Sequence, residues 1–230
     1  MSYGIEVTNA SGFTQIDGTY DNISSFASGS VTRSYVNASG SQILNKVSFP
    51  TNTPTDYLIF AKPTAQTTTR QITLAVYSDG FAFFAPWQAS SSFTLDYFIG
   101  VRSRDMPTNT SPDYGLEVYK SNGEQAYSSN NANFRVSAVS FDDLTSTAYS
   151  PTSFTVGSMS GIYTLMSGKN YVGRSPQGWP SFSIIYSFFQ EFDYTAKTIA
   201  GKITPVTNAA PSQSGLFGGG FKTNLIGTLT

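Results

Sequence analysis

The chain has 230 residues and a formal net charge of −1, and only 12% of its residues are charged. It contains no basic run, so the electrostatic signature of a nucleic-acid-binding protein is missing. It also contains no histidine and no cysteine, which excludes Ser-His-Asp and Cys-His nucleophiles and most zinc sites, so we expect a protein that is not an enzyme and holds no metal or cofactor.

The residue types of the chain are those of short β-strands. Aromatic side chains make up 15% of the sequence, and Ser, Thr and Asn fill many polar positions where long helices need Glu, Lys and Arg. No stretch keeps an apolar stripe at helical spacing, and no apolar run reaches the ~18 residues of a membrane helix. The start of the chain lacks the basic and apolar regions of a signal peptide. We therefore expect an all-β protein that is made in a cytoplasm and does not insert into a membrane.

The first predicted element is a β-hairpin. Ile5 and Val7 point to one face of a strand and Glu6 to the other. Residues 9–12 read Asn-Ala-Ser-Gly, a turn whose glycine allows a positive φ, and residues 13–16 form the second strand.

A series of short strands follows in the first half of the chain. The predicted strands are residues 43–49, 56–61, 70–77, 81–85 and 92–102. Between two of them, Ser78-Asp79-Gly80 predicts a hairpin turn of type I′, because Asp-Gly readily takes positive φ angles. Strands at this spacing, separated by turn signals, are typical of a sandwich or barrel.

A boundary is predicted near the middle of the chain. Residues 107–113 contain two prolines and several turn formers but no aliphatic run, which is typical of a linker. The prediction is a first β domain over residues 1–106, a linker over 107–113 and a second β domain over 114–208.

The opening hairpin recurs 111 residues later, directly after this linker. Residues 3–12 read Tyr-Gly-Ile-Glu-Val-Thr-Asn-Ala-Ser-Gly, and residues 114–123 read Tyr-Gly-Leu-Glu-Val-Tyr-Lys-Ser-Asn-Gly. We interpret the match as a sign of internal duplication. It predicts two β-sandwich-like domains, each of which opens with a hairpin.

The second half repeats the pattern of short strands. The predicted strands are residues 124–127, 134–141, 153–156, 163–166, 182–194 and 198–204. Residues 209–230 contain a triple glycine between Phe217 and Phe221, so we expect a Gly-rich C-terminal arm that orders against a partner or else frays.

Two tryptophans are the candidate ligand-binding residues. Trp87 and Trp179 lie in Pro-Trp-Gln and Gly-Trp-Pro contexts, which are typical of loops or strand edges. Exposed aromatic rings beside polar groups stack on sugars, and this is the basis for expecting a glycan on the host surface. The alternative is ordinary burial, since tryptophan is highly buried on average.

Carboxylates supply the remaining candidates. Glu191 and Asp193 share one face of a predicted strand and are the best pair for glycoside hydrolysis, although a solvated face is the favoured interpretation. Residues 17–21 and 142–143 offer oxygen ligands to calcium, but neither has a full loop pattern. The neighbouring Arg102 and Arg104 either pair with carboxylates across the domain interface or face water.

The repeated opening also resembles a known family. Small tail-associated structural proteins of bacteriophages and prophages often begin with a segment of the type Tyr-Gly-Leu-Glu-Val-x-Asn-x-x-Gly, which is similar to residues 3–12 and again to residues 114–123. The resemblance covers ten residues in each copy and transfers no catalytic residue. Family members carry this segment at the N-terminus, whereas here it occurs a second time in mid-chain.

The resemblance implies a structural protein of the virion, at the tail tip, the baseplate or a fibre attachment, synthesised in the cytoplasm of the bacterial host. Its partners would be other virion tail proteins. Low charge suits a surface that partners cover, and most oligomers close by symmetry, so we also expect a homo-oligomer. A carbohydrate- or receptor-binding β-sandwich module is the alternative hypothesis.

Overall fold

The computed structural model describes residues 6–8, 14–17, 21–33, 46–64, 69–84, 93–107, 115–143, 153–166, 171–174, 183–209 and 221–229. Within these ranges every regular element except the 3-10 turn η1 (Ser103–Asp105) is a β-strand, which confirms the all-β prediction. The same ranges contain no helix that is long and apolar enough to cross a membrane. The strands are β1 (Glu6–Thr8), β2 (Thr14–Asp17), β3 (Ile23–Arg33), β4 (Val47–Ser48), β5 (Tyr57–Pro63), β6 (Arg70–Tyr77), β7 (Gly80–Phe84), β8 (Phe93–Arg102), β9 (Glu117–Tyr119), β10 (Gln125–Ser128), β11 (Phe134–Asp143), β12 (Ser153–Thr155), β13 (Ile162–Leu165), β14 (Tyr171–Arg174), β15 (Ser183–Asp193), β16 (Thr198–Ala209) and β17 (Phe221–Leu229).

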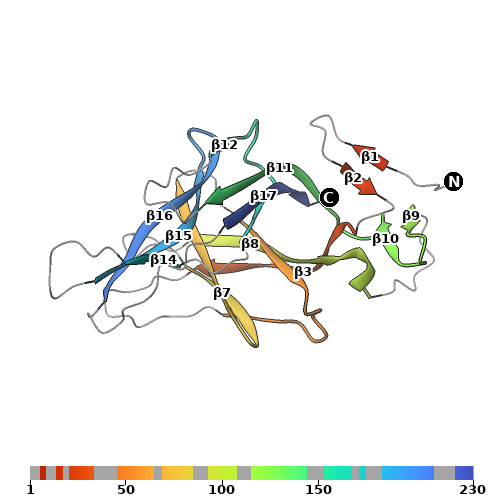
Figure 1. The fold of residues 1–230 in the computed structure, drawn as a ribbon, viewed down its shortest axis with the longest axis horizontal. Coiled ribbons are helices and arrows are strands. Elements are labelled where there is room, and N and C mark those ends of the chain that lie inside the picture. Colours follow the sequence, from red (N-terminus) through yellow and green to blue (C-terminus); the bar gives the residue numbers. More distant parts are fainter. Residues whose placement is uncertain are drawn as a thin grey trace.

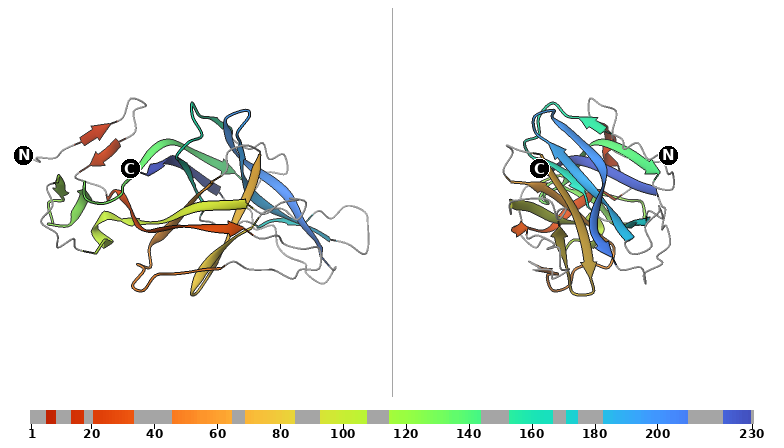
Figure 2. Two further views of the ribbon diagram at one scale, coloured as in Figure 1. Left: turned by 180° about the vertical axis from the view of Figure 1, so that it is seen from behind. Right: turned by 90° about the vertical axis from the view of Figure 1, so that its left-hand side faces the viewer.

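Two large sheets form the body of the molecule. One has six strands in the order β11-β17-β13-β5-β8-β3, and the other has the order β12-β16-β15-β6-β7-β4 with β14 added beside β15. The main hydrophobic core lies between them, because Ile59, Ile99 and Ile226 of the first sheet pack with Phe81 and Phe192 of the second. The body is therefore a β-sandwich, which Figures 1 and 2 show from three sides.

The six-stranded sheet also curls toward a closed barrel. Its two edge strands meet where Ser24 of β3 forms a β-bridge with Asn133, the residue before β11. A second core, which we call the barrel core, lies on the face of this sheet that is turned away from the seven-stranded sheet. All six strands contribute to it. Its members are Ile23, Leu58, Phe60, Phe98, Phe134, Val136, Tyr163, Leu165, Leu225 and Leu229. The curl lets one sheet bury apolar side chains on both of its faces.

In each large sheet, the three strands from the first half of the chain and the three from the second half follow the same order, each counted from its own edge of the sheet. From the edge inward, β3-β8-β5 corresponds to β11-β17-β13, and β4-β7-β6 corresponds to β12-β16-β15. Irregularities recur as well, because β3 has a bulge between Ser25 and Ala27, and β11 has one between Val136 and Ala138, 111 residues later. The two halves of the chain thus form the same succession of strands. Their common origin by duplication stays a prediction.

The predicted boundary at residues 107–113 does not separate two sandwiches. Strands from the two halves pair directly, β5 with β13 and β6 with β15, so both large sheets extend across the boundary. The physical reason is that each half supplies only three strands to each large sheet on the main path, and these half-sheets complete one another. We therefore correct the prediction of two separate domains over 1–106 and 114–208 to one shared sandwich.

Three strands, β3, β14 and β17, lie where no strand was predicted, and β17 corrects a specific prediction. Residues 209–230 were expected to form an arm, but β17 is an inner strand between β11 and β13. Successive side chains of β17 point to opposite faces of the sheet, so Leu225 lies in the barrel core and Ile226 in the main core. The serine-rich β3 was missed because its apolar residues are sparse.

The hairpin of β6 and β7 is confirmed, but its turn is not of the predicted type. Tyr77 pairs with Gly80, so Ser78 and Asp79 are the two central residues, and neither has a positive φ. The glycine serves another purpose. A Cβ at Gly80 would lie 2.1 Å from the carbonyl oxygen of Val47, so glycine is needed for the close approach of β4.

The two predicted opening hairpins are confirmed and match each other. Val7 pairs with Ile16 in the first, and Val118 pairs with Tyr127 in the second, exactly the same positions at an offset of 111. Both pairings also have a register shift at the equivalent position, between the pairs of Val7 and Thr8 in the first hairpin and between those of Val118 and Tyr119 in the second. Gly123 takes the positive φ expected for the turn, at 84°. Each hairpin forms a separate two-stranded sheet outside the sandwich.

Candidate functional site

The two hairpins lie together at one end of the elongated molecule (Figure 1), and η1 packs against β10 of the second hairpin. We call the β1–β2 hairpin, the β9–β10 hairpin and η1 the hairpin end. A two-stranded hairpin is marginally stable by itself in water, so its position depends on contacts with the rest of the fold. These contacts are best defined for the β9–β10 hairpin.

A buried layer of neutral hydrogen bonds attaches this hairpin to the sandwich. The backbone N–H of Asn22 donates to the carbonyl oxygen of Ala126 in β10 at 3.0 Å, and the carbonyl oxygen of Asn22 accepts from the N–H of Ser103 at 2.8 Å. The hydroxyl of Ser24 lies 2.8 Å from that of Ser103 and donates to Asn133 at 2.9 Å. Ser24 and Ser103 are almost fully buried, so these bonds are shielded from water.

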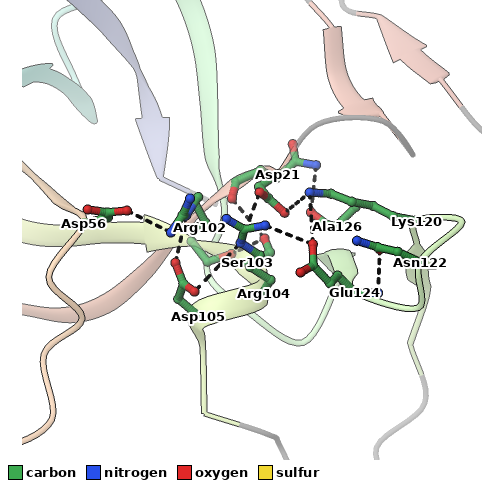
Figure 3. Close-up of polar contacts among 12 residues, drawn as sticks. Asp21, Asp56, Arg102, Ser103, Arg104, Asp105, Lys120, Asn122, Glu124 and Ala126 are labelled. Atoms are coloured by element: carbon green, nitrogen blue, oxygen red, sulfur yellow. Dashed lines mark hydrogen bonds and ion pairs between the residues drawn. The ribbon is translucent and has the colours of Figure 1, made fainter.

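Ion pairs form a second layer over the same contact (Figure 3). The ammonium of Lys120 lies 2.8 Å from the carboxylate of Asp21, and the guanidinium of Arg104 lies 2.9 Å from that of Glu124. Arg104 also lies 3.6 Å from Asp21 and 3.9 Å from Asp105. Because Lys120 and Glu124 flank the turn of the hairpin, these pairs tie the hairpin to the start of β3 and to η1.

Arg102 completes the cluster on the side of the sandwich. It donates to Asp105 at 2.8 Å and to Asp56 at 2.9 Å. Of the two arginines, Arg104 pairs across the predicted boundary with Glu124, as one of the alternatives had it, whereas Arg102 pairs with carboxylates of its own half. Asp21, which was considered as a calcium ligand, instead pairs with Lys120 and Arg104.

We expect the attachment of the hairpin to weaken in acid. Hydrogen bonds from Asn122 and Arg104 lower the pKa of Glu124 below its ordinary value of 4.5. A lowered pKa means that this carboxylate stabilises the attachment above about pH 4.5, and that the contribution disappears as the pH falls through the lowered pKa. Amide exchange in β9 and β10, corrected for intrinsic rates, should accelerate relative to the sandwich at pH 3.

Two substitutions make this expectation specific. Glu124→Gln should bring part of the faster exchange to neutral pH and reduce its acid dependence. Glu117→Gln is the matched control, because Glu117 lies on the same hairpin but bonds to the hydroxyl of Tyr119. Equal behaviour of the two variants would show that the pair of Glu124 with Arg104 does not hold the hairpin.

The hairpin end also carries exposed apolar side chains. Among the described residues, the exposed large hydrophobic side chains are those of Val7, Leu116 and Tyr119, on or next to the hairpins, and of Val76 on β6. Tyr119 is 53% exposed and Leu116 is 46% exposed.

The two hairpins differ in how well the sandwich covers them. Val118 of the second hairpin is 8% exposed, whereas Val7 at the equivalent position of the first hairpin is 40% exposed. The second hairpin packs beside η1 and carries Lys120 and Glu124 for its ion pairs. At an offset of 111 the first hairpin has Asn9 and Phe13 in their place. The first hairpin therefore lacks these ionic contacts and exposes an apolar position that the second hairpin buries.

The remaining candidates lie elsewhere. Trp87 and Trp179 fall outside the described residues, so their role in glycan binding stays a prediction.

Glu191 accepts a hydrogen bond from Gln71 on the neighbouring strand, and Asp193 accepts from the backbone N–H groups of residues 195 and 196 at 2.9 Å. Both carboxylates thus take part in local structure, on the face opposite the buried Phe192.

Another charged group lies on the barrel-core face of the six-stranded sheet. Lys62 donates to Asp96 at 2.9 Å, and Ser30 and Thr64 donate to the same carboxylate at 2.6 and 3.2 Å. Burial raises the pKa of Asp96, but the bonds from Ser30, Lys62 and Thr64 outweigh this effect and lower the pKa below its ordinary value. The carboxylate is satisfied by its own neighbours, so this cluster supports the packing of β3, β5 and β8.

One buried polar side chain carries a stability prediction. Gln190 of β15 is 1% exposed, and its amide has no hydrogen-bond partner within the described part of the chain. An unpaired buried amide costs about 1 to 3 kcal/mol, so Gln190→Leu should raise the free energy of unfolding by a similar amount. Urea titration measures the change. The control Gln71→Leu removes an amide that bonds to Glu191 and should not stabilise the protein. A Gln190→Leu variant less stable than the parent protein would contradict the expectation.

Comparisons with known proteins add no relative. No protein-family model, no curated protein and no solved structure matches the chain.

The sequence pointed to Arg102 and Arg104 but missed Lys120 and Glu124, which bind the hairpin to the sandwich. A signal for them was present, because the repeat aligns both residues with uncharged ones in the first copy. What the hairpin end offers chemically is a surface for binding: apolar side chains on short strands, held in place by buried hydrogen bonds and ion pairs.

Proposed function

We propose that this chain is a structural component of a bacteriophage tail that works through protein–protein contacts at its hairpin end. The observation that carries the proposal is the position of the exposed apolar residues. Of the four exposed large hydrophobic side chains in the described part of the chain, Val7, Leu116 and Tyr119 belong to this end.

The resemblance to tail-associated proteins falls on the same place. The residues that carry it include Glu6 and Val7 of β1 and Glu117 and Val118 of β9. A motif shared with virion proteins therefore coincides with the hairpins that expose apolar side chains. This coincidence favours a docking role at the tail tip, the baseplate or a fibre attachment, with other virion tail proteins as partners.

The attachment of the β9–β10 hairpin supports the same role. Side chains that bind a partner lose less conformational entropy when their backbone is already fixed. The pairs of Lys120 with Asp21 and of Glu124 with Arg104 fix that backbone from two sides. A preformed surface of this kind suits an adaptor that works without turnover of a substrate.

Mass spectrometry of gradient-purified particles from the source culture or an induced lysogen tests the proposal. The chain should co-purify with a tail tube protein at a fixed ratio, and that ratio would bound the symmetry of its assembly. Absence from the particles would overturn the tail function. Glycan binding through Trp87 and Trp179 would then be the hypothesis to test, by screening the isolated protein and its Trp→Ala variants.

A further inference from the structure

The turn of the β9–β10 hairpin contains an Asn-Gly dipeptide. It is Asn122-Gly123, and the sequence has no other. Both residues are exposed, and they join β9 to β10. The backbone N–H of Gly123 donates to the carbonyl oxygen of Lys120 at 3.0 Å, and Gly123 takes a φ of 84°, as the last residue of a short hairpin loop often does. The dipeptide therefore has a defined conformation at the surface of the molecule.

An asparagine that precedes glycine is chemically labile. The backbone nitrogen of the following residue attacks the side-chain amide carbon, and glycine leaves that nitrogen uncovered because it has no Cβ. Every other asparagine of the chain is followed by a residue that has a Cβ. The sequence thus favours Asn122 over all other asparagines for this reaction.

The hydrogen bonds of the turn act on the reacting atoms. The amide oxygen of Asn122 accepts from the backbone N–H of Glu124 at 3.1 Å. This donor faces the oxygen on which negative charge develops when the amide carbon is attacked, as in an oxyanion hole. The N–H of Gly123 has to leave the carbonyl oxygen of Lys120 before its nitrogen reacts. Only this one exposed bond has to open, in a hairpin whose own stability is marginal.

We propose that Asn122 is a modification site at which the folded chain converts asparagine to aspartate and isoaspartate. The nitrogen of Gly123 bonds to Cγ of Asn122, and the bond from Cγ to the amide nitrogen breaks. The proton of the Gly123 N–H passes through water to the leaving group, which departs as ammonia. The five-membered imide then takes up one water molecule at either of its two carbonyl carbons, which gives aspartate or isoaspartate. Each product adds one carboxylate, so the net charge falls from −1 to −2.

The modification alters the contact that attaches the hairpin to the sandwich. A hydrogen bond from the side chain of Asn122 to the carboxylate of Glu124 is the largest of the effects that lower the pKa of Glu124 (Figure 3). Neither product can donate this bond, and each places a second negative charge beside Glu124. The pair of Glu124 with Arg104 at 2.9 Å thereby loses support. The hairpin should detach more often as the chain ages, and this inference does not depend on the proposed docking function.

Peptide mapping by mass spectrometry, with enzymatic methylation to detect isoaspartate, tests the modification. The full chain is kept folded in mildly alkaline buffer and sampled over time. Asn52 is the internal control, because it lies in an exposed turn but precedes the β-branched Thr53. The reaction should be at least about tenfold faster at Asn122 than at Asn52, which is about 1.4 kcal/mol in the barrier. Equal rates, or a reaction at Asn122 that occurs only in urea, would overturn the proposal.

Amide exchange in β9 and β10, compared with the sandwich, tests the effect on the hairpin. Exchange should accelerate as the parent chain ages, and it should be fast from the start in Asn122→Asp. Asn122→Ser is the matched control, because serine is neutral, accepts a backbone N–H in a similar turn and has no amide to lose. Its exchange should not change with age. Equal ageing of this variant and the parent chain, or an aged and modified parent chain that exchanges as slowly as a fresh one, would overturn the effect on the hairpin.

Discussion

Replacing Phe60 by alanine should lower the free energy of unfolding by about 3 to 5 kcal/mol, the range found for large aromatic residues in cores. The side chain of Phe60 is fully buried in the barrel core. Its ring stacks on Phe98 with centroids 4.5 Å apart and contacts the ring of Phe134 at 4.4 Å. The substitution thus removes a large buried surface and two aromatic contacts at once. With a total stability of about 5 to 15 kcal/mol for a typical domain, a loss of this size is a large fraction of the whole.

The same variant tests whether the two halves share one fold. Phe60 and Phe98 belong to the first half of the chain, whereas Phe134 belongs to β11 of the second half. Urea unfolding followed by fluorescence and by circular dichroism should therefore give one transition that shifts as a whole. Val76→Ala, on an exposed face of β6, is the control and should cost less than about 1 kcal/mol. Two transitions, with only one shifted by Phe60→Ala, would contradict the shared sandwich.

Among the glycines that the structure describes, Gly227→Ala should be the most damaging exchange, at a cost of about 3 kcal/mol or more, because it overpacks the barrel against backbone. A Cβ at Gly227 would lie 2.0 Å from the carbonyl oxygen of Arg135 and 2.8 Å from its carbonyl carbon. The neighbouring strand β11 cannot yield without breaking its pairing with β17. At Gly100, the equivalent position beside the bulge of β3, the nearest atom is a methyl group of Ile23 at 2.7 Å, and a side chain moves more easily.

Thermal unfolding of three alanine variants measures this difference. Gly227→Ala should have the lowest melting temperature, followed by Gly100→Ala. Gly157→Ala is the control, since a Cβ there meets nothing within 4 Å, and it should leave stability unchanged or slightly raised. A Gly227→Ala variant as stable as the Gly157→Ala variant would contradict the position of β17 beside the bulge of β11.

Local features of the sequence were enough to predict the strand class and the hairpins. The alternation of Ile5, Glu6 and Val7 and the glycine of the turn predicted the first hairpin, and the repeat at an offset of 111 predicted the second. These features depend on residues close together in the chain. Most predicted strands in the described ranges were found for the same reason.

The arrangement of the strands could not be predicted in this way. The pairing of β5 with β13 joins residues about one hundred positions apart, such as Ala61 and Thr164, and nothing near either residue specifies the other. The apparent linker at residues 107–113 then favoured two domains. The triple glycine before β17 likewise favoured an arm, although the strand pattern of residues 221–229 was present in the sequence.

The candidate site was predictable only in part. Arg102 and Arg104 stood out because they alternate on the strand that leads into the predicted linker, but the sequence did not show which carboxylates they pair with. Lys120 binds Asp21, and this pair exists only because β3 begins beside the second hairpin. The exposure of Val7 against the burial of Val118 required the structure, since the sequence treats the two valines as equivalent.

Hydroxyl-radical footprinting of the chain, free and in its assembled state, tests most directly whether the hairpin end is the docking surface. Val7, Leu116 and Tyr119 should be labelled in the free chain and lose most of their labelling on assembly. Val76 is the internal control, because it is 48% exposed and lies on β6 of the sandwich, and it should keep more of its labelling than the hairpin residues. Unchanged labelling of the hairpin residues, or protection of Val76 in their place, would contradict the account.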